Sequence, residues 1–193
     1  MSENTRMIVC GVWKTFCARI CREAEEMLNI VLLEPEMPAN TGNIGRTCCA
    51  TGTRLHLIEP MGFRINDTML KRAGLDYWKN LDVTVYDCYE DFLEQNPGAR
   101  QCLYMATTKA RQSYAQVQYP ENAYIMFGKE SAGIPEEILI EHEKTAIRIP
   151  MNEHIRSLNL SNSVAIVLYE ALRQHDFMQM QMEGNLHRLH WKE

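Results

Sequence analysis

Three segments of this sequence carry residue types that could do chemistry. The first, from Pro35 to Arg46, reads PEMPANTGNIGR. Its prolines stiffen the chain, Asn40 or Thr41 can cap a helix that begins there, and Arg46 lies within about two turns of that start. Backbone amides at a helix N-terminus and a nearby arginine together favour an anion such as phosphate. A capped helix with a surface arginine is the alternative, and the residues alone do not decide between the two.

The other two segments add a carboxylate and a group of small polar side chains. In Phe127–Pro135 (FGKESAGIP), Glu130 stands between Gly128 and Gly133, where an ordinary strand-to-helix turn would need no acid. The segment Ile149–Ser163 holds three serines and three asparagines. Hydroxyl and amide groups are costly to bury without partners, and capping one helix uses only one or two of them. We therefore expect the remaining ones to line a site.

Apolar runs separated by helical patterns predict the elements that hold these segments. Strands are expected at residues 29–33, 54–58, 83–86, 102–106, 123–127 and 146–149, and helices near 42–52, 66–75, 89–95, 135–141 and 159–177. Continuous apolar strands that alternate with helices are typical of the α/β class, with a mainly parallel sheet flanked by helices. Ligands of such sheets bind at the carboxyl ends of the strands, and each of the three segments begins where a strand ends.

The last expected helix, residues 159–177, is apolar on nearly every side, with Ser161 or Asn159 as its cap. Such a helix must be covered on most of its sides. Packing within one chain and packing against a second copy in a homodimer are equally compatible with its periodicity.

The length of 193 residues leaves room for one domain, which we place at residues 27–193, with a short polar tail from about residue 178. Residues 1–26 differ in character from the rest, and the first strand follows directly after Met27. We interpret residues 1–26 as an N-terminal extension without a catalytic role, or as an artefact of the assigned start.

Composition excludes several classes of protein. The net charge of −5 excludes a generally basic nucleic-acid-binding protein, so any RNA must be held by a local basic patch or across a dimer. No apolar run approaches the roughly 18 residues that span a membrane. The seven cysteines form no C-x-x-C pair, and His187 and His190 have no acidic or thiol partner at ligand spacing. The odd number of cysteines indicates a reducing compartment, here the cytoplasm, and no metal site is expected.

The three segments, in this order, resemble the three motifs of the SPOUT class of RNA methyltransferases. The likeness is greatest to the TrmL/YibK subfamily of tRNA (cytidine/uridine-34) 2′-O-methyltransferases. The stretches that carry it are EPEMPANTGNIGR, IEPMGF, KRAGLDYW, MFGKESAGIP, IRIPM and RSLNLSNSVAIVLYEA. It runs from Met27 to about Gln174 and leaves the first 26 residues uncovered.

The resemblance implies a deep C-terminal trefoil knot in which S-adenosylmethionine binds, and a homodimer with its two sites at the subunit interface. It implies methyl transfer, without a metal, to the ribose 2′-hydroxyl of the wobble nucleotide 34, a cytidine or modified uridine in the anticodon loop of leucine tRNAs. S-adenosylhomocysteine would be the product, and neither DNA nor a membrane is an expected partner. A related enzyme that acts on another tRNA or rRNA nucleotide, and a non-enzymatic RNA-binding module, are the alternatives.

The resemblance also implies roles for residues of this sequence. Arg46 would anchor the substrate phosphate and stabilise the developing alkoxide, since a guanidinium stays protonated and is a poor base. Asn40 would orient the first segment, and the pocket would be organised by Glu130, Ser157 and Asn159. The cofactor would contact Ala106, Thr107, Met126, Gly128, Ile149, Met151, Ser157 and Leu158. The RNA would be held by Arg46, Arg64, Lys71, Arg72, Lys109, Arg111 and Arg156. Tyr77 and Trp78 either stack on a base or, as we favour, pack under a helix.

Overall fold

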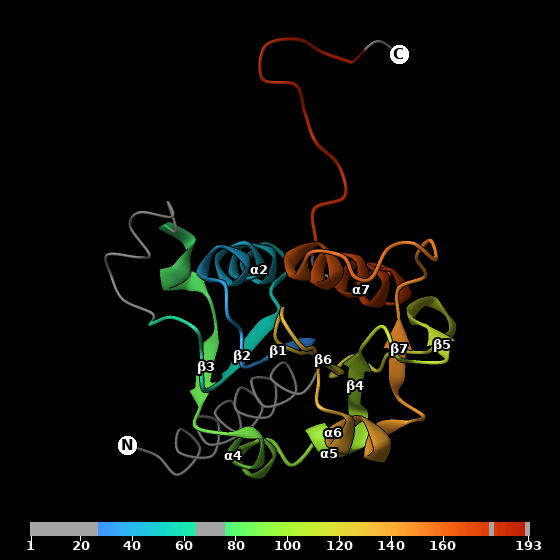
Figure 1. Ribbon diagram of the computed structural model, residues 1–193. Helices are drawn as coiled ribbons and strands as arrows, with labels where there is room; N and C mark the ends of the chain where they lie inside the picture. Colours follow the sequence, from blue (N-terminus) through green and yellow to red (C-terminus); the bar gives the residue numbers. More distant parts are fainter. Residues whose placement is uncertain (1–26, 65–75, 178–179, 192–193) are drawn as a thin grey trace, which may run out of the picture.

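One parallel sheet forms the centre of the fold, which the computed structural model describes for residues 27–64, 76–177 and 180–191 (Figure 1). Within these residues the sheet has seven strands in the order β3-β2-β1-β6-β4-β7-β5, and all of its pairings are parallel. The strands are β1 (Asn29–Leu33), β2 (Arg54–Ile58), β3 (Val83–Tyr86), β4 (Leu103–Ala106), β5 (Gln112–Ser113), β6 (Tyr124–Phe127) and β7 (Ala146–Arg148). The predicted α/β class is confirmed. The six predicted strands agree with the observed ones to within one residue at each end, and β5 was not predicted.

Helices cover both faces of the sheet. Helices α2 (Pro38–Thr51) and α7 (Leu160–Gln174) lie side by side on one face, and the shorter α4 (Tyr89–Gln95), α5 (Ala99–Cys102) and α6 (Glu136–Leu139) lie on the other (Figure 1). Short 3-10 turns in the described residues are η1 (Asp76–Asn80), η2 (Tyr114–Gln116) and η3 (Ile140–His142). The helix predicted near residues 66–75 lies outside the described residues. The last predicted helix is found, but it ends at Gln174 rather than at residue 177.

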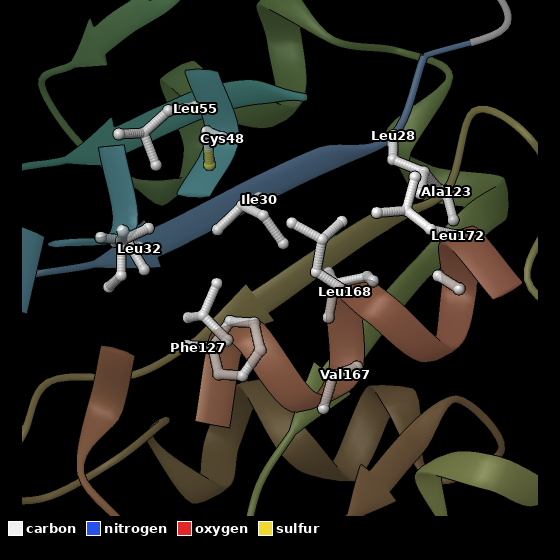
Figure 2. Close-up of a cluster of buried hydrophobic side chains, with 14 of the residues drawn as sticks. Leu28, Ile30, Leu32, Cys48, Leu55, Ala123, Phe127, Val167, Leu168 and Leu172 are labelled. Atoms are coloured by element: carbon white, nitrogen blue, oxygen red, sulfur yellow. The ribbon is translucent and has the colours of Figure 1, made fainter. Parts of the chain in front are cut away.

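The central strands are mostly apolar because both of their faces are buried. In β1, Ile30 and Leu32 pack in the cluster beneath α2 and α7 (Figure 2), whereas Val31 and Leu33 belong to the cluster on the opposite face. Burying a side chain of this size contributes about 1.5–3 kcal/mol. The continuous apolar run of β1 therefore reflects alternate burial on two faces, as parallel sheets require.

Helix α2 begins at Pro38 instead of residue 42, and its cap differs from the prediction. The N-cap residue is Met37, which makes no side-chain cap bond, so the expectation that Asn40 or Thr41 caps this helix is wrong. A proline suits the first helical position because its φ is already helical and it lacks the amide hydrogen that a helix start leaves unbonded. Asn40 and Thr41 lie buried in the first turn, and the Asn40 amide is thereby left for other partners.

Gly45 lies inside α2 and allows η1 to approach the helix. A Cβ atom at this position would lie 2.8 Å from Cζ3 of Trp78. Trp78 is partly buried against the core cluster beneath α2, which supports packing rather than base stacking for this residue. The side chain of Tyr77 lies outside the described residues, so its role stays a prediction.

Helix α7 has one buried and one exposed face. Val164 and Val167 are fully buried against the sheet, whereas Ile166 and Tyr169 keep 36% and 44% of their surface exposed. Asn159 caps the helix by accepting hydrogen bonds from two amides of its first turn, as predicted. Packing within the chain therefore covers one face of α7 and leaves apolar side chains on the other.

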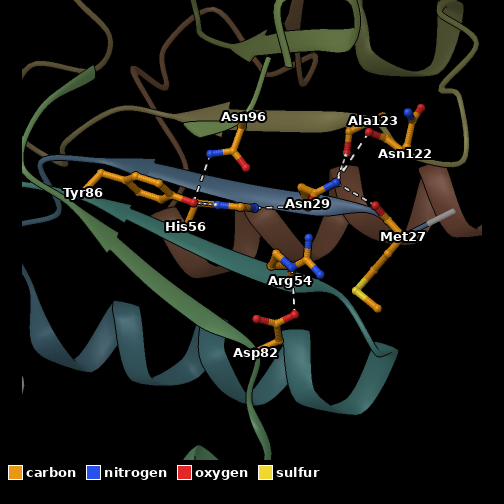
Figure 3. A network of polar contacts seen from close by, with 9 residues as sticks. All are labelled: Met27, Asn29, Arg54, His56, Asp82, Tyr86, Asn96, Asn122 and Ala123. Carbon is orange, nitrogen blue, oxygen red and sulfur yellow. Dashed lines mark hydrogen bonds and ion pairs between the residues drawn. The ribbon is translucent and has the colours of Figure 1, made fainter. Parts of the chain in front are cut away.

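A small polar cluster lies within the apolar core near α4 (Figure 3). His56 Nε2 lies 3.1 Å from Asn29 Oδ1, and His56 Nδ1 lies 2.8 Å from the Tyr86 hydroxyl oxygen. The Asn29 amide nitrogen donates to the Met27 carbonyl at 2.6 Å, so Oδ1 faces the imidazole and can only accept. We infer that His56 donates from Nε2 and accepts the Tyr86 proton at Nδ1, an arrangement that requires a neutral imidazole.

Stability is expected to fall on acidification because His56 must stay neutral in the folded state. Burial, with a smaller contribution from Arg54, lowers the pKa of His56 from 6.5 to about 4. Between these values the unfolded chain binds more protons than the folded one, so the free energy of unfolding rises with pH. We expect a loss of about 2 kcal/mol between pH 7 and pH 5, to be measured by chemical denaturation at both pH values. In His56→Gln the loss should shrink to the contribution of the other groups, and equal losses in both proteins would contradict this role.

Candidate active site

A cavity of about 490 Å³ lies at the carboxyl ends of β4, β6 and β7. Its wall is formed by the ends of these strands and the loops that follow them, by the start of α2, and by the residues that lead into α7 together with the first two turns of that helix. The position is the one expected for the ligand site of a parallel sheet. The volume lies in the range of pockets that hold cofactors and other small molecules.

Seven of the eight residues expected to contact the cofactor line this cavity: Ala106, Thr107, Gly128, Ile149, Met151, Ser157 and Leu158. The exception is Met126, which is fully buried in the core cluster on the α4 side of the sheet. Alternate residues of a strand point to opposite faces, so Phe127 reaches the cavity and Met126 does not. The structure therefore gives Met126 a place in the core instead of a contact with the cavity.

Hydrogen bonds join one residue from each of the three polar segments beside the cavity. Asn159 Nδ2 donates to Asn40 Oδ1 at 3.0 Å, and Asn40 Nδ2 donates to Glu130 Oε1 at 2.9 Å. All three residues line the cavity. Because Asn40 is only 5% exposed and lies between two partners, its amide is held in one orientation. We call this chain of contacts, Asn159–Asn40–Glu130, the Asn40 link.

Further contacts brace the first segment against the second. Glu130 Oε2 accepts the backbone amide of Glu36 at 2.9 Å, so both oxygens of Glu130 serve as acceptors. The Glu36 carboxylate accepts the hydroxyl and the amide of Ser131 at 2.8 and 2.9 Å, and these bonds lower the pKa of Glu36. Lys129 Nζ lies 2.7 Å from Glu34, which raises the pKa of Lys129. The role of Glu130 that follows from these contacts is to position Asn40 and the first segment.

Arg46 is exposed on α2 and does not line the cavity in the described part of the chain. It follows Asn40 by six residues in the same helix, which places it about 9 Å farther along the helix axis and on another side. An exposed arginine outside the cavity suits a partner that approaches from solvent, such as an RNA phosphate. The structure thus separates Arg46 from the four other residues expected to take part in catalysis.

The remaining basic residues expected to bind RNA have different surroundings. Lys109 lines the cavity and pairs with Glu136 at 2.8 Å, and Arg111 pairs with Glu143 at 2.9 Å. Exposed ion pairs contribute little to stability, so a phosphate could displace either acid. Arg64 and Arg156 are exposed. Lys71 and Arg72 lie outside the described residues.

The sequence reasoning missed some residues of the cavity wall. Apolar ones, such as Phe127, Ile147 and Val167, belong to segments read only as strands or as a core helix. Arg148 is the least expected, because it ends an apolar strand. Its Nε atom is buried and has no hydrogen-bond partner among the described residues. The sequence did contain a signal for Arg148: a positively charged residue stands directly before the third polar segment, at a strand end where a ligand is expected.

Other features of the described residues bear on what the site can hold. No group of three or more His, Cys, Asp or Glu side chains in this part of the chain is arranged to bind a metal ion. None of the helices found there combines the length and apolar character needed to cross a bilayer. Cys48 in α2 is fully buried, and burial raises the pKa of its thiol to about 12, so it serves packing.

The parallel sheet and the cavity at its carboxyl edge place this protein in the class of α/β proteins with a small-molecule site. Over residues 27–169 the chain matches the SpoU rRNA Methylase family. It therefore belongs to that family and is a methyltransferase, which confirms the resemblance to the SPOUT class.

Individual relatives agree with this assignment. An Escherichia coli (strain K12) protein named tRNA (cytidine(34)-2′-O)-methyltransferase is 52% identical over 150 residues, which cover 77% of this chain and 94% of the relative. A structure described as giving insights into the 2-OH methylation of C/U34 on tRNA has a TM-score of 0.72 and 42% identity, covering 78% of this chain and 97% of that one. An AdoMet-bound rRNA methyltransferase from Sinorhizobium meliloti has a TM-score of 0.68 and 25% identity, covering 77% of this chain and 57% of that one.

The cavity fits the S-adenosylmethionine that this family implies. Phe127, Ile147 and Ile149 provide an apolar wall against which an adenine ring can pack. The buried Nε of Arg148 is a donor still without an acceptor among the described residues. Both the apolar and the polar parts of the molecule therefore find matching groups.

Proposed function

We propose that this methyltransferase acts on tRNA and transfers the methyl group of S-adenosylmethionine to the ribose 2′-hydroxyl of nucleotide 34. The observation that carries the proposal is the likeness to the Escherichia coli relative named for this reaction, which extends over 94% of that protein. The family match also includes all three polar segments, and these meet at one cavity.

The finer substrate is proposed from the resemblance to the TrmL/YibK subfamily. Nucleotide 34 is the wobble position, and we propose that it is a cytidine or a modified uridine of leucine tRNAs. It lies in the anticodon loop, where unpaired nucleotides can be splayed out and their 2′-hydroxyls presented to a protein. Because tRNA is decoded in the cytoplasm, we propose that the enzyme works there.

The proposed reaction makes few chemical demands on the protein. When bound, S-adenosylmethionine would supply a methyl group on a positively charged sulfur. The new C–O bond to the ribose oxygen would form as the C–S bond breaks, which leaves S-adenosylhomocysteine with a neutral sulfur, and the hydroxyl proton would pass to solvent water. The residues of this chain must align the reacting atoms and hold the RNA. The Asn40 link fixes one polar group at the cavity wall. Arg46 binds the phosphate beside the acceptor ribose and stabilises the negative charge that develops on its oxygen.

We also propose the trefoil knot and the homodimer. In support of the knot, the segment that follows β7 shares one cavity with the loops that follow β4 and β6. In support of the homodimer, Ile166 and Tyr169 leave apolar surface on α7, next to α2. A two-fold contact through this face would bring identical surfaces together, and it would let an acidic chain combine the basic residues of two copies.

Methylation of a leucine tRNA transcript with cytidine at position 34 tests the proposed function. The protein and S-adenosylmethionine are incubated with the transcript, and new 2′-O-methyl groups are mapped by nucleotide. We expect about one methyl group per tRNA, at nucleotide 34 alone. The matched control is the same RNA with a 2′-deoxycytidine at that position, which should accept none.

Two outcomes would contradict this substrate. Equal methylation of the control transcript would move the reaction to another tRNA nucleotide. Transfer to ribosomal RNA fragments, with none to any tRNA, would favour the substrate that the family description names.

A further inference from the structure

Arg148, the last residue of β7, lines the cavity and has an unsatisfied donor. Its Nε atom is buried without a hydrogen-bond partner among the described residues. A guanidinium stays protonated in proteins, and a buried donor without an acceptor is costly to the folded state. A ligand with a suitable acceptor would remove this cost.

The register of the sheet places Arg148 among other cavity residues. The Thr107 amide donates to the carbonyl of Ile147 at 2.9 Å, so Thr107 and Arg148 lie side by side on the same face. Gly128 continues this row on the neighbouring strand β6, since Ala106 pairs with the last residue of that strand. All three members of the row line the cavity, and Gly128 has no side chain to fill it. This row shares its face of the sheet with Met126 and Ala146, so Arg148 lines the cavity from the face opposite to the apolar wall of Phe127 and Ile147.

The other charged side chains of the cavity wall already have partners. Lys109 Nζ lies 2.8 Å from Glu136, and Lys129 Nζ lies 2.7 Å from Glu34. Both oxygens of Glu130 accept hydrogen bonds, as described above. Within the described residues, Arg148 is thus the one charged group of the cavity without a hydrogen-bond or ion-pair partner.

We infer that Arg148 binds the carboxylate in the amino-acid part of S-adenosylmethionine. The inference rests on the proposed function, which makes that molecule the methyl donor. Its adenine and ribose are uncharged and its sulfur and amine are positive, so the carboxylate is its one anionic group. A guanidinium binds a carboxylate through two parallel hydrogen bonds, and one of them can come from the buried Nε.

An RNA phosphate is a poorer partner for this arginine. Asn40 and Arg46 belong to α2, which follows β1, and β7 lies three strands away from β1 in the sheet order. That separation is roughly 14 Å. A phosphate held at Arg46 is therefore a different anion from the one at Arg148, and a buried Nε is out of reach of a backbone that lies on the surface.

Calorimetric titration of the full chain with two ligands tests the inference. Decarboxylated S-adenosylmethionine keeps the amine and the sulfonium but lacks the carboxylate. We expect the wild type to prefer S-adenosylmethionine by about 10–100-fold, and Arg148→Gln to lose that factor while its affinity for the decarboxylated ligand stays within about threefold. Arg148→Lys, which keeps the charge without the paired donors, should fall between them. The matched control is Arg100→Gln, an exposed arginine on α5, which should bind both ligands as the wild type does.

A second measurement separates binding from folding. Because Nε makes no bond in the ligand-free protein, the thermal midpoint of ligand-free Arg148→Gln should not fall below that of the wild type. Equal losses of affinity for both ligands, together with a lower midpoint, would make Arg148 a structural residue and overturn the inference. Unchanged affinity for S-adenosylmethionine with weaker tRNA binding would assign Arg148 to an RNA phosphate and overturn it as well. If the wild type binds both ligands equally, only the role of Arg148 fails, whereas binding of neither ligand would overturn the proposed function itself.

Discussion

Arg46→Ala is expected to lower the rate of methyl transfer to tRNA by about 10²–10³-fold, while the affinity for S-adenosylmethionine stays within about twofold of the wild type. The two effects separate because Arg46 is exposed on α2 and lies outside the residues that line the cavity. A protonated guanidinium beside the acceptor ribose stabilises charge that develops only during the reaction, so its loss falls on the rate. Single-turnover kinetics with tRNA and calorimetry with S-adenosylmethionine measure the two quantities.

Two further variants make this prediction sharper. Arg46→Lys keeps a positive charge but loses the planar pair of donors, so we expect it to retain only part of the rate. Arg100→Ala removes an exposed arginine from α5, on the other face of the sheet, and should leave the rate unchanged. A parallel fall in cofactor affinity and rate for Arg46→Ala would place this residue in the cofactor site instead, and an unchanged rate would exclude it from the reaction.

The strands could be predicted from the sequence because their burial is two-sided. Residues 29–33 are apolar at four of five positions and residues 54–58 at three of five, and both runs became strands with the predicted bounds. Strand β5, with only Gln112 and Ser113, has no such run, and it forms because the edge of β7 offers it a partner. A strand that exists through its neighbour leaves no hydrophobic pattern of its own.

The start of α2 shows a different limit of sequence reasoning. Asn40 and Thr41 have the chemistry of caps, and the prediction therefore began the helix after them. Pro38 supplies an equally good start without any side-chain cap, and the chain uses it. The Asn40 side-chain oxygen, which is the atom that could have capped α2, instead accepts a hydrogen bond from Asn159, 119 positions away in sequence, and Asn40 Nδ2 donates to Glu130.

The site was predictable at the level of loops but not of contacts. Each polar segment follows a strand, and the carboxyl ends of parallel strands share one edge, so the meeting of the segments was expected. Which groups face one another depends on strand alternation and on side-chain rotamers. Met126 and Phe127 are adjacent in an apolar strand, yet only Phe127 lines the cavity. Arg148 belongs to the site because β7 ends at this residue. The sequence pattern predicted that the strand would end one residue later, at Ile149.

Gly128→Ala is expected to weaken S-adenosylmethionine binding by about 100-fold or more and to lower the free energy of unfolding by about 1–3 kcal/mol. A Cβ atom at this position would lie 2.1 Å from the carbonyl carbon of Gly133 and 2.2 Å from the amide nitrogen of Ile134. Both are backbone atoms, so no side chain can rotate away and the loop itself must open. The same loop carries Glu130, and its displacement would release the Asn40 link as well as change the cavity wall.

Two other glycines distinguish the steric clash at Gly128 from general effects of alanine. Gly98 has a φ of −64° and no neighbour within 4 Å of an added Cβ, so Gly98→Ala should match the wild type in binding and stability. Gly133 also has open space, but its φ of +72° disfavours a side chain, and Gly133→Ala should cost about 1–2 kcal/mol of stability through backbone strain. Chemical denaturation should show the smallest loss of stability for Gly98→Ala, a larger one for Gly133→Ala and the largest for Gly128→Ala. Calorimetry should show the large loss of cofactor affinity for Gly128→Ala. If Gly128→Ala bound the cofactor like the wild type, the loop after β6 would have room to move without consequence, and neither the Asn40 link nor the cavity wall could depend on its present position.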